Sequence, residues 1–164
     1  MTMRRHENAG SELFVDDTHA PLMIATWIGE PTLPLVEAYQ QWLVEQVGRA
    51  QSGNYRLVLM SDSTLTELPS GAARKALSED RTQSDDIVIK TVVVITSSVI
   101  RGALTAIKWL VGERFGDVEV RDSTSEGIAR CLEVLDQHGI ERPNLSPTSY
   151  VFPTASASLR AKTS

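Results

Sequence analysis

Two short runs of consecutive apolar residues, at 57–60 and 92–95, constrain the fold of this chain more than any other feature. A run without alternating polar positions is typical of a strand that lies inside a sheet and is covered on both faces. Segments with helical spacing lie between and after the two runs, and the connections are short. Strands joined in this way run parallel through helical crossovers. The pattern therefore predicts an α/β domain.

Two further extended segments, at 12–17 and 22–29, lie near the start of the chain and are separated by turn-forming residues and Pro21. Apolar segments divided by such residues are typical of paired strands. We therefore expect a mixed, mostly parallel sheet with an N-terminal strand pair and about four helices.

The best-defined helix is expected over 32–50. Thr32 can cap it, Pro34 suits its first turn, and its apolar residues recur at helical spacing (Val36, Tyr39, Leu43 and Val47). The remaining elements are expected as a strand at 55–62, a loop at 61–71, a helix at 70–86, a strand at 91–96, a helix at 98–113, a strand at 117–120 and a helix at 123–139.

The two ends of the chain differ in composition from its middle. We expect residues 1–10 to be disordered, residues 11–140 to form one domain, and residues 141–164 to be a flexible tail rich in Ser, Thr, Pro and Ala. One apolar island in the tail, at 150–152, can pack on the domain, contact a partner or belong to a plain linker.

Charge and composition argue against several partners. The net charge is −5 and the pI is about 5.2, which disfavours nucleic acid or an anionic membrane as a partner of the whole domain. No apolar run is long enough for membrane insertion, and the N-terminus lacks the apolar core of a signal peptide. The single cysteine, Cys131, has no partner within the chain, so we expect a cytoplasmic protein.

Catalytic signals are weak, and we expect no enzyme. The three histidines have no spacing typical of a metal site or a Ser/His pair, and no glycine-rich phosphate loop is present. Cys131 follows Ile128 by three residues, which is typical of a buried small hydrophobe rather than a nucleophile. We therefore predict no cofactor.

Three segments resemble bacterial SpoIIAA-like proteins of the STAS superfamily (STAS/SEC14-type), namely WIGEPTLPLVEAYQQWL, YRLVLMSD and the stretch from Val94 to Leu132. The resemblance covers about 12–139 and is clearest in RGALTAI at 101–107, followed by Trp109 and Leu110. It implies a mixed sheet with helices packed on it. It also implies a role in binding another protein or a small apolar ligand, not catalysis.

The best-known members of that superfamily are phosphorylation switches. A serine at the start of the helix after the third strand is modified and changes partner affinity. The matching position here is Ser70, followed by Gly71. The acidic-Ser-Ser-Gly motif is absent, because Leu68 and Pro69 precede Ser70. Ser70 is therefore a candidate phosphosite, and the alternative is that it only caps the helix.

Ser97, Ser98 and Arg101 lie where a buried strand opens into a helix. Hydroxyls, backbone N–H groups and a guanidinium can converge there on an anion. The alternative is a capped helix in which Arg101 is solvated or paired with an acidic side chain.

The helix at 98–113 is apolar around most of its circumference, with Arg101, Thr105 and Lys108 as its clearly polar residues. Such a helix is buried on more than one side. The second side either packs within the domain or forms an interface that includes Trp109, which would make the protein a homodimer.

These observations favour a non-enzymatic regulatory or scaffolding module that binds another protein and can self-associate. The partner surface would include this helix and the loop at 61–70. The alternative is a small carrier that binds a lipid or other apolar ligand between helix and sheet, with the helix at 72–84 as a movable lid.

Overall fold

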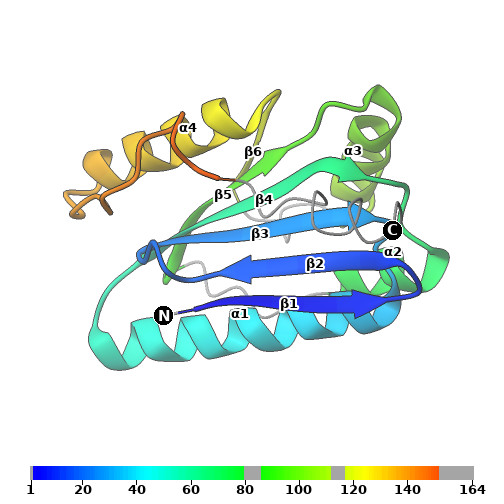
Figure 1. The fold of residues 1–164 in the computed structure, drawn as a ribbon, viewed down its shortest axis with the longest axis horizontal. Coiled ribbons are helices and arrows are strands. Elements are labelled where there is room, and N and C mark those ends of the chain that lie inside the picture. Colours follow the sequence, from blue (N-terminus) through cyan, green and yellow to red (C-terminus); the bar gives the residue numbers. More distant parts are fainter. Residues whose placement is uncertain (1, 80–85, 112–116, 152–164) are drawn as a thin grey trace, which may run out of the picture.

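The computed structural model describes residues 2–79, 86–111 and 117–151 (Figure 1). For residues 104 and 106–111 it describes the backbone only. These residues form, in order, β1 (Met3–Asn8), β2 (Ser11–Asp16), β3 (Leu22–Gly29), α1 (Leu33–Gly53), β4 (Leu57–Thr66), α2 (Gly71–Ser78), β5 (Val88–Val94), α3 (Ser98–Val111), β6 (Val118–Arg121) and α4 (Thr124–Gln137).

The six described strands form one sheet in sequence order, β1-β2-β3-β4-β5-β6. The first three strands pair antiparallel, and β3 to β6 pair parallel. The predicted fold class is thus confirmed: a mixed, mostly parallel sheet with antiparallel strands at its N-terminal side. The crossovers between parallel strands are helical, as short apolar strands separated by helices require.

Helices cover both faces of the sheet (Figure 1). Side chains from α1 and α2 pack on one face against Leu13, Met23 and Leu59. Side chains of α4 pack on the other face. They contact strand residues such as Ile24 and Met60, which follow Met23 and Leu59 in the sequence and point the opposite way. Because successive strand residues point to opposite faces, the apolar run at 57–60 serves both cores.

The helix predicted at 32–50 forms as α1. Thr32 stands at its N-cap with extended backbone, although its hydroxyl makes no capping hydrogen bond. Asn54 ends the helix in a left-handed conformation with φ of 53°, and its backbone N–H donates to the carbonyls of Ala50 and Gln51. The helix therefore runs one turn farther than its apolar spacing indicates.

Three expectations about irregular segments were wrong. Residues 3–8, expected to be disordered, form β1, where Arg5 pairs with Glu12 and Arg4 with Glu45 of α1. The loop expected from residue 61 begins only after Thr66, because β4 accommodates one extra residue opposite Thr26–Ile28 and then continues to pair with β3 as far as Gly29. Residues 141–151, expected to be part of a flexible tail, pack Leu145 and Tyr150 against the core under α4. Residues 152–164 lie outside the described part.

Candidate functional site

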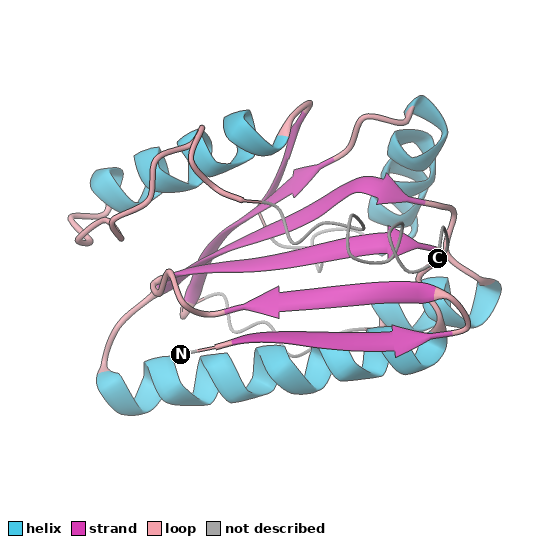
Figure 2. Cartoon of the chain, viewed as in Figure 1, coloured by secondary structure: helices cyan, strands magenta, loops and turns pink. Residues whose placement is uncertain are grey.

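The parallel strands β3 to β6 all end at one edge of the sheet, called here the carboxyl edge. The helices α1, α2, α3 and α4 each begin directly after one of these strands, so four loops meet at this edge (Figure 2). In open α/β sheets this is the edge at which ligands and partners bind. The predicted phosphosite and anion corner both lie here.

Arg101, in the first turn of α3, contacts two loops of the carboxyl edge. Its guanidinium donates a 2.9 Å hydrogen bond to the carbonyl oxygen of Ile95, at the end of β5. The same group forms an ion pair with the carboxylate of Asp122, in the loop between β6 and α4. Arg101 therefore links the loops that follow two neighbouring strands.

The residues of the predicted anion corner lie between the end of β5 and the first turn of α3. The hydroxyl of Ser97 accepts a 3.4 Å hydrogen bond from the N–H of Ile100, and Ser98 is the first residue of α3. Because the guanidinium of Arg101 is already paired with Asp122, an anion would have to compete with that carboxylate. The pairing matches the alternative in which Arg101 has an acidic partner.

Asp62 forms a second link at this edge, which sequence reasoning did not find. This fully buried carboxylate accepts hydrogen bonds from the N–H and hydroxyl of Thr64, at 3.0 and 2.8 Å. It also accepts a 2.6 Å hydrogen bond from the hydroxyl of Thr124, the first residue of α4. The only sequence signal is the tripeptide Asp-Ser-Thr, which occurs at 62–64 and again at 122–124.

Ser70 stands at the N-cap of α2, as predicted for a capping serine. Its hydroxyl accepts a 3.1 Å hydrogen bond from the N–H of Ala73, and its side chain is half-buried. The residues before it are open to solvent, with Leu68 47% exposed.

Four exposed apolar side chains lie in segments at the carboxyl edge. They come from the start of α1, the end of β4, the loop before α2 and the first turn of α3, and are here called the apolar edge surface: Leu33, Leu65, Leu68 and Val99. Leu65 is 50% exposed and Val99 62% exposed. Large apolar side chains that face water together are typical of interaction surfaces.

Two residues of the interface predicted on α3 can be placed. Arg101 and Thr105 are exposed, and the Thr105 hydroxyl donates to the carbonyl of Arg101, one turn earlier. Lys108 and Trp109 lie on the same helix, but their side chains are outside the described part.

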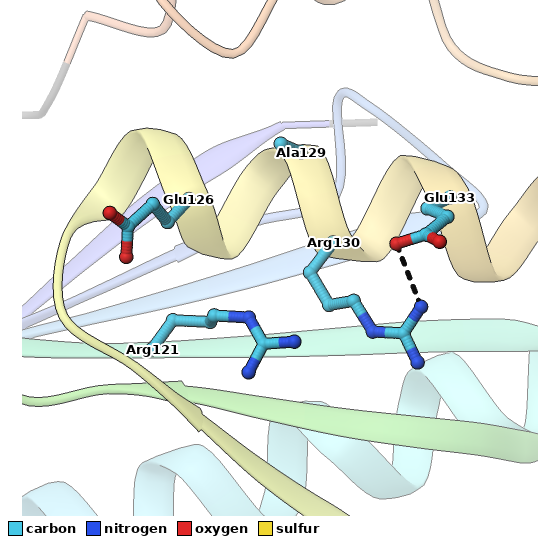
Figure 3. Close-up of a pocket in the computed structure, with 5 residues that line it drawn as sticks. All are labelled: Arg121, Glu126, Ala129, Arg130 and Glu133. Carbon is cyan, nitrogen blue, oxygen red and sulfur yellow. Dashed lines mark ion pairs between the residues drawn. The ribbon is translucent and has the colours of Figure 1, made fainter.

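A shallow pocket of about 310 Å³ lies between β6 and α4, lined by Arg121, Glu126, Ala129, Arg130 and Glu133 (Figure 3). Both arginines that line it already have acidic partners, since Arg121 pairs with Glu119 of β6. Arg130 pairs with Glu133 at 2.8 Å and with Glu119 of β6 at 2.9 Å. Partial burial opposes ionisation of Glu119, but the hydrogen bond from Arg130 and the nearby cations hold its pKa below the ordinary value.

Cys131 faces the core under α4, as predicted. Burial raises the pKa of its thiol to about 12, so the thiol is protonated at neutral pH and is no nucleophile. Within the described ranges, no group of three or more His, Cys, Asp or Glu side chains could hold a metal ion. Among the same residues, no helix is long and apolar enough to span a bilayer.

No protein-family model matches the chain, and no curated protein matches it. Solved structures do. SpoIIAA, an anti-sigma factor antagonist, in its unphosphorylated form, is similar over 77% of this chain and 97% of its own, with a TM-score of 0.51 and 12% identity. An uncharacterised DUF3478 protein of Shewanella loihica PV-4 with a SpoIIAA-like fold covers 79% of this chain and 92% of its own, with a TM-score of 0.47 and 10% identity. The chain thus has the SpoIIAA-like fold that its sequence indicates.

Proposed function

We propose that this chain is a cytoplasmic, non-enzymatic regulatory or scaffolding module that binds another protein through its carboxyl edge. The apolar edge surface carries the proposal. These side chains are already about half-buried. Covering the exposed half of a leucine or valine on a partner therefore contributes roughly 1 kcal/mol per residue. The fold adds support, since SpoIIAA is an anti-sigma factor antagonist.

Ser70 could regulate this surface. Phosphorylation adds a charge of about −1.5 to −2 at neutral pH, and backbone N–H groups at the start of α2 would stabilise it. The phosphate would lie two residues from Leu68, inside the surface that a partner must bury. We expect phosphorylation to weaken partner binding, because a buried phosphate must lose its water.

A capture experiment with a matched control tests the proposed surface. Tagged wild-type protein is compared with Leu68→Glu and with Val44→Glu, which places the same charge on an equally exposed apolar residue of α1 (53% against 47%). A partner captured by the wild type and Val44→Glu but lost with Leu68→Glu supports the proposal. Equal capture by both variants would refute it.

Self-association through α3 is a separate part of the proposal. It rests on the exposure of Arg101 and Thr105 and on the apolar composition of the helix around Lys108 and Trp109. Light scattering coupled to size exclusion should show a wild-type dimer and a folded monomer for Trp109→Glu. A monomeric wild type at micromolar concentration would remove this part.

The carrier of an apolar ligand is kept as a second candidate because α2 is weakly held. Ala73 is its one fully buried residue, with Ala76 and Leu77 only partly covered. A helix with so little buried surface can open at low cost. Native mass spectrometry distinguishes the two functions, because a carrier would co-purify with a small molecule.

A further inference from the structure

The segment at 140–151, called here the strap, returns from the end of α4 across the sheet. The N–H of Ile140 donates to the carbonyl of Leu135 at 2.9 Å, and Arg142 forms an ion pair with Asp136. Ile140, Leu145 and Tyr150 then pack against the core under α4. The strap therefore places an aromatic side chain on the sheet.

Tyr150 covers polar side chains on that face of the sheet. Its hydroxyl donates to a carboxylate oxygen of Asp16 at 3.4 Å, which is long for such a bond. The ring lies edge-on to His19, with 5.8 Å between ring centroids. Burial and the negative charges of Asp16 and Asp62 raise the pKa of Tyr150, so its hydroxyl remains a donor at neutral pH.

The buried acidic residues of this protein fall into two groups. Glu12 is paired with Arg5, and Asp17 with Arg49 of α1 at 2.9 Å. Asp16 and Asp62 are equally buried, at 2% and 0% exposed, yet no Lys or Arg within the described ranges contacts either one. The basic group nearest to Asp16 among these residues is the imidazole of His19, whose Nε2 lies 3.9 Å from a carboxylate oxygen of Asp16. Charges this deeply buried ordinarily have a cationic partner or a metal.

Thr26 lies between these two carboxylates. It pairs directly with Asp62 of β4, and Asp16 of β2 pairs with Ile24, two residues before it on β3. The alternation of strands places Asp16, Thr26 and Asp62 on the α4 face. The hydroxyl of Thr26, a residue only 1% exposed, has no partner at ordinary hydrogen-bond distance among the residues that the structure describes. It is still near enough to the Tyr150 hydroxyl to lower the pKa of that group, against the larger effects that raise it.

We propose that Asp16 and Thr26 form a binding site for an organic cation that carries an ammonium or guanidinium group. The negative charge of Asp62 on the neighbouring strand adds to the attraction. Tyr150 covers this site in the state described. An ammonium has donors for both the Asp16 carboxylate and the Thr26 hydroxyl, where Tyr150 has one hydroxyl. Asp16 and Asp62 stand on strands separated by β3, so their backbones are roughly 10 Å apart. Neither carboxylate belongs to a group of three or more His, Cys, Asp or Glu side chains that could hold a metal ion among the described residues.

The site shares Asp62 with the carboxyl edge, but it does not require a partner bound at the apolar edge surface. Because the cation and Tyr150 occupy the same place, the strap must leave before the cation binds. The apparent affinity of the wild type is then the intrinsic affinity multiplied by the fraction of molecules in which the strap is undocked. The source of the cation is either a lysine or arginine of a partner protein or a free amine.

The test uses full-length Tyr150→Ala, titrated with n-butylammonium chloride and followed by the backbone amide resonance of Thr26. Sodium chloride at equal ionic strength and n-butanol are the controls for salt and for the apolar chain. We expect saturable binding at least roughly tenfold tighter than in the wild type. A second substitution, Asp16→Asn, should weaken it roughly 10- to 100-fold, as expected for one charge-assisted hydrogen bond.

Asp17→Asn is the matched control, since Asp17 is a buried neighbour that already has Arg49. It should leave the affinity for butylammonium unchanged. An N-acetyl-Gly-Lys-Gly amide peptide that binds more tightly than butylammonium indicates a partner protein, and one that binds more weakly indicates a free amine. No saturable binding, or equal losses with Asp16→Asn and Asp17→Asn, would overturn the proposal.

Tyr150→Phe provides a second route if the alanine variant does not fold. It keeps the packing of the ring and removes the hydroxyl that contacts Asp16. Butylammonium should then raise the Tm of Tyr150→Phe more than that of the wild type. Equal shifts in Tm would count against the site.

Discussion

Gly127 gives the sharpest test of how α4 sits on the sheet. A Cβ atom built at this position would lie 2.5 Å from Cγ2 of Val94 on β5 and 3.0 Å from the sulfur of Met60 on β4. Carbon atoms in contact prefer separations of about 3.5–4.0 Å. Gly127→Ala therefore forces α4 away from the sheet or Val94 out of its rotamer.

Two opposing effects set the magnitude. Overpacking a well-filled core costs about 1–3 kcal/mol. Replacing glycine by alanine inside a helix contributes up to about 1 kcal/mol in the other direction. We expect Gly127→Ala to lower the free energy of unfolding by about 1–2 kcal/mol, because both Val94 and Met60 are fully buried and have little room to move.

Gly48→Ala is the matched control. Gly48 lies inside α1, and a Cβ there meets nothing within 4 Å. The same substitution should raise the free energy of unfolding by about 0.5–1 kcal/mol. Urea unfolding followed by circular dichroism measures both. If Gly127→Ala were as stabilising as Gly48→Ala, the close contact of α4 with β4 and β5 would be refuted.

Three further predictions concern single side chains. Ser70→Ala should lower the free energy of unfolding by about 1 kcal/mol, because the hydrogen bond from the Ala73 N–H is lost. Ser70→Gly should lower it by only a few tenths of a kcal/mol. Equal losses for the two variants in chemical denaturation would argue against the cap. The folded-state pKa of Cys131, about 12, lies above the unfolded value of 9.0, so its contribution to stability is complete below pH 9 and is lost as pH rises toward 12. Stability measured across that window should fall more steeply in the wild type than in Cys131→Ala, and parallel curves would contradict the burial of the thiol. A double-mutant cycle of Arg101→Gln and Asp122→Asn should give a coupling of about 0.2–1 kcal/mol that decreases with salt, whereas coupling unaffected by salt would mean that the pair is not an exposed ion pair.

Local patterns predict the elements that bury a regular apolar face. The spacing of Val36, Tyr39, Leu43 and Val47 defines α1, and the apolar runs define β4 and β5. The Ser-x-x-Glu spacing of Ser123 and Glu126 is typical of a capping box. The hydroxyl of Ser123 accepts a hydrogen bond from the N–H of Glu126, while the Glu126 carboxylate accepts from the N–H of Asp122 rather than that of Ser123. Gly139 follows the end of α4 with φ of 66°.

Elements held by distant partners were not predictable in this way. β1 has one large apolar residue, Met3, and is stabilised by pairing with β2 and by ion pairs to other elements. Tyr150 docks through contacts with His19 and Asp16, more than 130 positions earlier in the chain. The sequence locates Ser70 and Arg101 at helix starts, but the pairing of Arg101 with Asp122 depends on the order of β5 and β6 in the sheet.

Site-specific photo-crosslinking tests the central claim, that the carboxyl edge binds a protein, most directly. A photoreactive phenylalanine is placed in turn at Leu68, at Val99 and, as control, at Val44 on the outer face of α1. The proposed function predicts one common crosslinked protein from positions 68 and 99 and none from position 44. Crosslinks from position 44 alone, or from none of the three, would contradict it.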